Sequence, residues 1–171
     1  ALEGLGAEVV EIPTVFDTDP AISWATLVGA YLLRTVTRAG CDDWSVLDPT
    51  LHMLLELGQR TTPAFMVESE DACHRANLRL VEAFRDVSVL LTPTTAGITP
   101  RAGDTSNPNW VGFTYPFNMT RSPAGTVCAG LSSGGLPIGL QVIGPQHGDQ
   151  VVLRTIAALE QALGQPEPPR L

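Results

Sequence analysis

Residues 125–143 read GTVCAGLSSGGLPIGLQVI, two mainly apolar runs separated by Ser-Ser-Gly-Gly. Short apolar runs joined by a glycine-containing turn are typical of a β-hairpin. The pattern predicts strands over Gly125–Ala129 and Ile138–Ile143, with Gly134 or Gly135 adopting a positive φ in the turn between them.

A second interpretation of the same turn makes Ser132 or Ser133 a nucleophile. His147 and Asp149 follow closely enough in sequence to complete a Ser-His-Asp set. Asp149, however, stands before the helical pattern of Val151–Leu163, where it is predicted to cap the helix. The turn interpretation is therefore favoured over the catalytic one.

Composition limits the class of protein. The 171 residues are 44% hydrophobic and 16% charged, as expected of one globular domain. A net charge of -8 and a pI of about 4.7 argue against direct binding of nucleic acid. The longest apolar run is too short to span a membrane, and no signal peptide is visible. Three widely spaced cysteines suggest neither disulfides nor zinc, which favours a cytoplasmic location.

The upstream half of the sequence predicts helices that alternate with short strands. Leu2–Leu5 resembles the end of a helix and Val9–Ile12 a strand, so we expect further sequence before Ala1. Hydrophobic spacing predicts three longer helices, over Asp19–Gly40, Pro49–Leu57 and Thr62–Arg85. A buried strand over Val87–Leu91 and a long surface loop over residues 92–109 are predicted to follow before the hairpin. Residues 165–171 are predicted to form a proline-rich tail.

The best candidate for a ligand-binding surface follows the long loop. Its side chains combine large apolar area with a few polar groups, which is the composition of a pocket wall. An alternative for Phe113 and Phe117 is that they belong to the core. The predicted substrate-binding residues are Trp110, Val111, Thr114, Tyr115 and Asn118.

No metal site or cofactor is predicted. His52 and His74 each have a glutamate one helical turn away but no third ligand, so both are interpreted as ordinary helix residues. Cys128 has no basic neighbour in sequence and Cys41 has only Arg38, across a predicted helix end, so neither is interpreted as a nucleophile. All ten basic residues are arginine, so the chain contains no lysine.

Residues 114–161, TYPFNMTRSPAGTVCAGLSSGGLPIGLQVIGPQHGDQVVLRTIAALEQ, resemble the C-terminal signature of the amidase signature family. The segments LGAEVVEIP and VLLTPTTAGITP also look like parts of this family. Two positions depart from its pattern: Arg121 stands where glycine is usual and Cys128 where proline is usual. The residues in register are Pro116, Asn118, Thr120, Pro123, Ala124, Gly130, Gly135, Leu136, Pro137, Gly139, Leu140, Gln141, Gly144 and Glu160.

The resemblance implies a mechanism that this chain cannot perform alone. Family members cleave carboxamides with a nucleophilic serine, a second serine in a cis peptide bond and a lysine base, all in the N-terminal half of the protein. We therefore expect an α/β chain that is the C-terminal segment of a larger amidase domain. It would contribute part of a mixed β-sheet flanked by helices and one wall of the substrate pocket, without a cofactor.

Three alternatives remain within this interpretation. The parent protein is an amide hydrolase, the A subunit of a glutamyl-tRNA amidotransferase, or a chain in which residues 1–171 form an independent interaction module. The expected partners are the N-terminal catalytic portion and a small amide substrate. The sequence leaves three points open: whether the chain associates with copies of itself, which substrate it binds, and how Arg121 and Cys128 affect the pocket.

Overall fold

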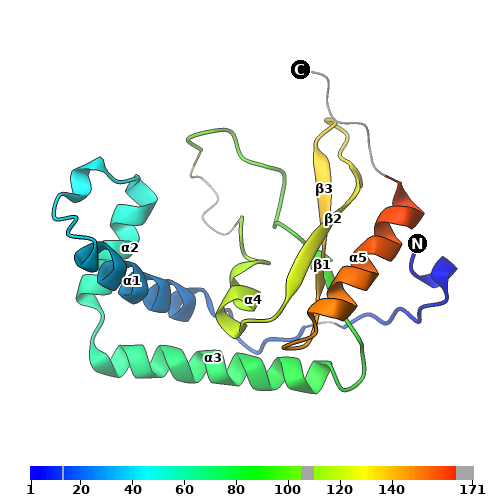
Figure 1. Ribbon diagram of the computed structural model, residues 1–171, viewed down its shortest axis with the longest axis horizontal. Helices are drawn as coiled ribbons and strands as arrows, with labels where there is room; N and C mark the ends of the chain where they lie inside the picture. The colour runs from blue at the N-terminus through cyan, green and yellow to red at the C-terminus, as the bar shows by residue number, and fades with distance from the viewer. Residues whose placement is uncertain (13, 105–109, 165–171) are drawn as a thin grey trace. The chain divides into compact units, whose positions relative to one another are not determined.

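The computed structural model describes the whole chain except residues 13, 105–109 and 165–171. The predicted C-terminal tail and the end of the predicted surface loop therefore lie outside the described residues. The chain divides into two compact units (Figure 1). One comprises Phe16–Leu78, and the other comprises Ala1–Val15 together with Arg79–Leu171.

The three helices predicted from hydrophobic spacing are confirmed. Two of them lie within Phe16–Leu78, and the third begins in that unit and ends in the other. A short 3-10 helix, η2, precedes the second. Their bounds are α1 (Ala21–Arg38), η2 (Trp44–Val46), α2 (Pro49–Arg60) and α3 (Pro63–Ala83).

Aspartate side chains mark the starts of α1 and α2. The Asp19 carboxylate accepts a hydrogen bond from the backbone N–H of Ala21 at 2.9 Å. The Asp48 carboxylate accepts one from Thr50 at 2.8 Å, with Pro49 in the first helical position. Because the first backbone N–H groups of a helix have no partner within it, these bonds fix where each helix begins.

Helices α1 and α2 pack against each other through two glycines. A Cβ atom added to Gly29 would lie 2.6 Å from the Leu54 carbonyl oxygen. A Cβ added to Gly58 would meet the Gly29 carbonyl oxygen and lie 2.7 Å from its carbon. Leu55, on α2, is fully buried. The two backbones approach so closely that neither position has room for a side chain.

The second unit contains a three-stranded antiparallel sheet in the order β1–β3–β2. The strands are β1 (Leu90–Pro93), β2 (Ala124–Leu131) and β3 (Pro137–Ile143). The predicted hairpin is therefore confirmed as β2 and β3. The predicted α/β class is confirmed as well, and every strand pair among the described residues is antiparallel.

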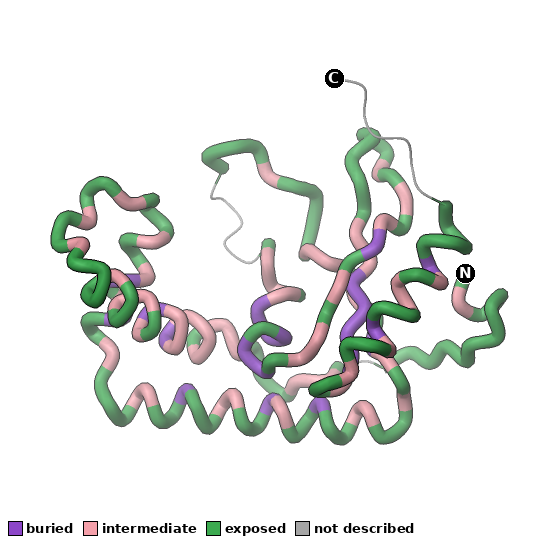
Figure 2. The backbone as a smooth tube through the Cα atoms, in the orientation of Figure 1, coloured by how far each residue is buried: buried purple, intermediate pink, exposed green. Residues whose placement is uncertain are grey.

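Helix α5 (Asp149–Leu163) covers one face of this sheet. Val127 and Val142 from the strands pack with Val152 and Leu159 from the helix, and all four are buried. Burial of one such side chain stabilises the fold by about 1.5–3 kcal/mol. In Figure 1 the short helix α4 (Tyr115–Thr120) lies on the other side of the sheet from α5, and Figure 2 shows buried positions on α4 and along the strands.

Three local predictions were wrong. Residues 7–12 form no strand and are exposed, because no described strand pairs with them. The strand predicted over Val87–Leu91 begins at Leu90 and runs through Pro93. It is not buried on both faces: Leu90 is 7% exposed, whereas Leu91, which points to the opposite face, is 36% exposed. Asp149 does not cap α5: the capping position is Gly148, and Asp149 lies within the first helical turn.

Candidate functional site

The predicted pocket-wall residues lie in one continuous turn and helix. Thr114 closes the turn, since its backbone N–H and its hydroxyl both donate to the carbonyl oxygen of Val111 at 2.9 Å. Helix α4 then begins at Tyr115, with Pro116 in its first turn. Proline has no N–H to donate, so it fits a helix start and favours this abrupt change from turn to helix.

The side chains of this segment differ in exposure. Trp110 is 40% exposed, and Asn118 is also exposed, whereas Val111 and Thr114 are half-buried. Tyr115 is only 5% exposed. The segment therefore presents an indole, an amide, a hydroxyl and an aliphatic group at or near the surface, and the ring of Tyr115 lies within the folded part.

The two phenylalanines separate in the structure. Phe117 is 6% exposed and belongs to the buried part of α4. Phe113 is 38% exposed, so the core interpretation holds for Phe117 and not for Phe113. Phe113 adds aromatic surface to the segment that contains Trp110.

A buried glutamine of β3 connects the sheet to this segment. The Gln141 side-chain amide donates to the carbonyl oxygen of Phe113 at 2.7 Å and to the hydroxyl of Thr92 on β1 at 3.0 Å. Gln141 is 4% exposed. Sequence reasoning placed Gln141 in the family signature but gave it no role, because its partners are 28 and 49 residues away in the chain.

Two hydroxyl groups lie beside Gln141 on the same region of the sheet. The Thr94 and Thr126 hydroxyls are 3.1 Å apart. Gly139 lies against both threonines: a Cβ added there would lie 2.5 Å from the Thr94 hydroxyl oxygen and 3.0 Å from Cγ2 of Thr126. This contact explains the glycine of the signature at position 139, and neither threonine was predicted.

The end of α4 is held by a second glutamine. Gln146 donates its side-chain amide to the Thr120 carbonyl oxygen at 2.8 Å. Arg121 follows with φ 56° and ψ 33°, in the left-handed region. The N–H of Ser122 bonds back to the Phe117 carbonyl oxygen at 3.0 Å. This pattern is the Schellman motif, in which glycine is preferred at the left-handed position, so the usual glycine of the family at 121 has a conformational reason.

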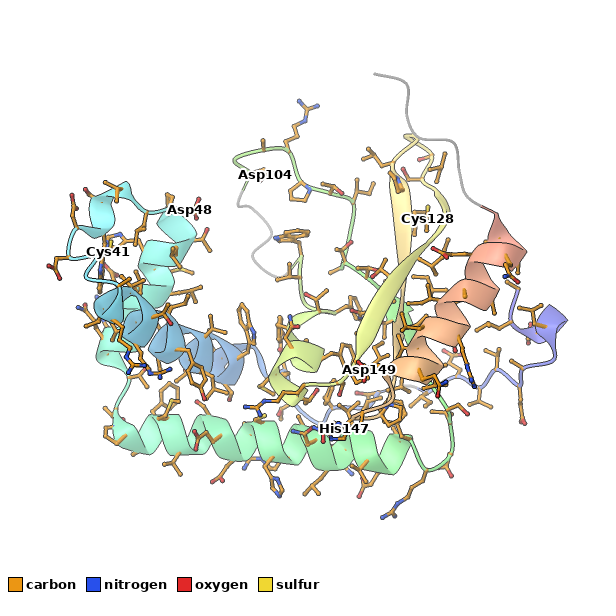
Figure 3. All side chains as sticks on the ribbon, in the orientation of Figure 1. Cys41, Asp48, Asp104, Cys128, His147 and Asp149 are labelled. Atoms are coloured by element: carbon orange, nitrogen blue, oxygen red, sulfur yellow. The ribbon has the colours of Figure 1, made fainter. Side chains whose placement is uncertain are left out.

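The serines of the hairpin form a turn. The Ser132 hydroxyl accepts the N–H of Leu136 at 3.1 Å, and Gly135 takes the positive φ of 78°. His147 and Asp149 lie near the other end of the hairpin (Figure 3). The seven residues of β3 separate Ser132 from them, which corresponds to roughly 20 Å along the strand. The Ser-His-Asp interpretation is therefore excluded by geometry.

The remaining titratable candidates behave as structural residues. The rings of His52 and Trp44 make an edge-on contact with centroids 6.1 Å apart. No disulfide joins Cys41, Cys73 and Cys128, which all lie in the described part of the chain. Among the described residues, no group of three or more histidine, cysteine, aspartate or glutamate side chains could hold a metal ion. No helix in the described part of the chain is long and apolar enough to cross a membrane.

Comparison with known proteins decides the family. The family model described as Amidase matches residues 43–153. The chain belongs to the amidase signature family. The match includes the hairpin, α4 and Gln141, so the residues that connect the wall segment to the sheet lie within the matched part of the amidase domain.

Individual relatives agree with this assignment. A fatty acid amide hydrolase of Medicago truncatula is 36% identical over 171 residues, covering 94% of this chain and 28% of the hydrolase. The A subunit of the glutamyl-tRNA(Gln) amidotransferase of Granulibacter bethesdensis is 45% identical over 87 residues, 47% of this chain and 17% of that protein. A crystallised amidase superposes with a TM-score of 0.84 at 25% identity, over 95% of this chain and 39% of that one. The chain thus spans well under half the length of these amidase relatives.

Proposed function

We propose that this chain is the C-terminal segment of an amide hydrolase whose catalytic serines and lysine lie outside residues 1–171. The observation that carries the proposal is a C-terminal family signature that departs from the family pattern only at Arg121 and Cys128, in a chain without lysine. The lysine base of the family mechanism therefore has to come from elsewhere. On this proposal residues 1–171 form one part of a larger cytoplasmic domain, without a cofactor, and extend its mixed sheet.

The contribution of this chain to the reaction is one wall of the substrate pocket. Its wall residues are Trp110, Val111, Thr114, Tyr115 and Asn118. Asn118 supports this role, because its side chain is exposed while its neighbours Phe117 and Met119 are buried in the scaffold. An amide side chain can donate to a substrate carbonyl or accept from its N–H, which suits a carboxamide.

A hydrolase of neutral amides is favoured over an amidotransferase A subunit. Free glutamine carries an ammonium and a carboxylate group, and a site that binds it has to compensate both charges. Residues 110–120 contain no charged side chain. The wall supplies aromatic and amide groups instead, which suit an uncharged substrate with an apolar substituent.

Two measurements test the proposal. The chain alone, assayed against a panel of aryl and alkyl carboxamides, should release no amine and should not react covalently with a fluorophosphonate. The protein that includes the sequence encoded upstream of Ala1 should do both, with the label on a serine outside residues 1–171. Amide hydrolysis by the chain alone would refute the proposal, and glutamine-dependent amidation of Glu-tRNA would establish the amidotransferase alternative.

A further inference from the structure

The side chain of Gln141 connects the sheet directly to residues 110–118, the wall segment. Its amide nitrogen has two hydrogens, and both are used: one bond goes to the Phe113 carbonyl oxygen at 2.7 Å and the other to the Thr92 hydroxyl at 3.0 Å. Thr92 and Gln141 are paired residues of β1 and β3. The pairing of the two strands therefore holds the Gln141 amide nitrogen in place, and its second hydrogen bond extends from there to the wall segment.

Because Gln141 is buried, its hydrogen bond to the Phe113 carbonyl is not easily replaced by a bond to water. Gln141 is 4% exposed, so water does not readily replace a lost partner. The bond is part-buried, and loss of the acceptor would leave the buried amide N–H of Gln141 without a partner, which is unfavourable. The glutamine side chain consequently restrains the position of the Phe113 carbonyl, and with it the turn from Val111 to Thr114.

A second attachment of this turn comes from a loop. The N–H of Ala96 donates to the Trp110 carbonyl oxygen at 3.0 Å, and Ala96 follows β1 in a segment without helix or strand. Of these two attachments, the one through Gln141 starts from a strand. Groups supported by strands are held more precisely than groups supported by loops.

We propose that Gln141 is a positioning residue that, through the Phe113 carbonyl, holds the side chains of Trp110 and Thr114 at the distance at which they contact the substrate. This inference rests on the proposed function, because it assigns those groups to the pocket wall. Gln141 does not touch the reacting atoms in this account. Its loss should therefore weaken and broaden substrate binding and leave the chemical step nearly unchanged.

The first test uses the chain itself and does not depend on activity. Gln141→Met keeps the length of the side chain and removes both hydrogen bonds. Amide hydrogen exchange in residues 110–115 should become at least about tenfold faster, while exchange in β3 changes little. Gln146→Met is a matched control, since Gln146 also donates to a backbone carbonyl, that of Thr120 at 2.8 Å. It should leave residues 110–115 unchanged.

The second test measures catalysis in the protein that includes the upstream sequence. Gln141→Met should raise KM about tenfold for the preferred amide and change kcat less than about twofold. Gln141→Asn, which keeps the amide but shortens its reach, serves if the first variant does not fold, and it should show the same split. Equal exchange rates in Gln141→Met and the unaltered chain would overturn the inference, as would a loss confined to kcat. Faster exchange without any amide hydrolysis by the unaltered protein would refute the proposed function alone.

Discussion

Arg121 ends α4 in a conformation that an L-residue adopts at a cost. Its φ of 56° lies in the left-handed region, where a residue with a Cβ atom is less stable by about 1–2 kcal/mol. Glycine avoids that cost but loses more backbone entropy on folding. We therefore expect Arg121→Gly to raise the free energy of unfolding by about 0.5–1 kcal/mol, measured by urea denaturation.

The matched control is Arg121→Ala. It removes the same guanidinium group but keeps the Cβ atom, so it should give no gain in stability. An equal gain in both variants would show that the charge of Arg121, and not its backbone conformation, is the destabilising feature.

Asp43 makes a pH-dependent contribution to the stability of the unit Phe16–Leu78. Hydrogen bonds from the Ser45 hydroxyl at 2.7 Å and from its backbone N–H at 3.0 Å lower the pKa of the Asp43 carboxyl below its ordinary 3.8. Because the folded pKa is the lower one, this contribution is present above the unfolded pKa and is lost as the pH falls through the folded value. A carboxyl titration by NMR should give a midpoint below 3.8, and Ser45→Ala should move it back upward. A midpoint that does not respond to Ser45→Ala would contradict this assignment.

Single positions could be predicted only where the cause is local. The positive φ at Gly135 follows from a turn of four residues, so its sequence was sufficient. Gln141 and Gly139 owe their roles to contacts with residues far away in the chain. The family signature marked both as important, but their partners Phe113 and Thr94 became evident only in the folded chain.

Helices and strands differ in how much of their stability is local. The spacing of apolar residues and the proline and glycine signals predicted α1, α2, α3 and the β2–β3 hairpin, since their backbone bonds join residues close in sequence. The segment over residues 7–12 has the composition of a strand, yet it forms none here. A strand needs a neighbour to accept and donate its backbone hydrogen bonds, and composition does not reveal whether that neighbour is present.

The packing of α1 on α2 makes a specific prediction. Gly58→Ala would place a methyl group against backbone atoms of Gly29, which cannot rotate away as a side chain can. Overpacking of this kind should lower the free energy of unfolding by about 2–3 kcal/mol. Gln59→Ala, an exposed substitution on the next residue, should change it by less than about 0.5 kcal/mol. Guanidinium denaturation followed by circular dichroism would measure both, and an unchanged stability of Gly58→Ala would show that the helices can separate without loss.

At the scale of the whole molecule, the solvent-accessible area of the chain is larger than that expected for compact domains of the same mass. Its accessible area is 11676 Å², whereas two separate compact domains of the lengths of its two units would expose roughly 9,700 Å² together. Large hydrophobic side chains stay exposed on the extended N-terminal segment and at the end of the hairpin, namely Val9, Val10, Leu131, Leu136 and Ile138.

This surface leads to a prediction about the isolated chain. Strands β1 and β2 are the two edges of a three-stranded sheet, and exposed edges with apolar side chains promote association. We expect concentration-dependent oligomers by light scattering after gel filtration, and strong binding of a hydrophobic dye. Replacing Leu136 with Ser and Ile138 with Thr should reduce both. On the proposed function, a catalytic portion joined in the same chain should reduce them further, because it would cover these edges. A monomer that unfolds cooperatively and binds no dye would instead favour an independent module and contradict the proposed incomplete domain.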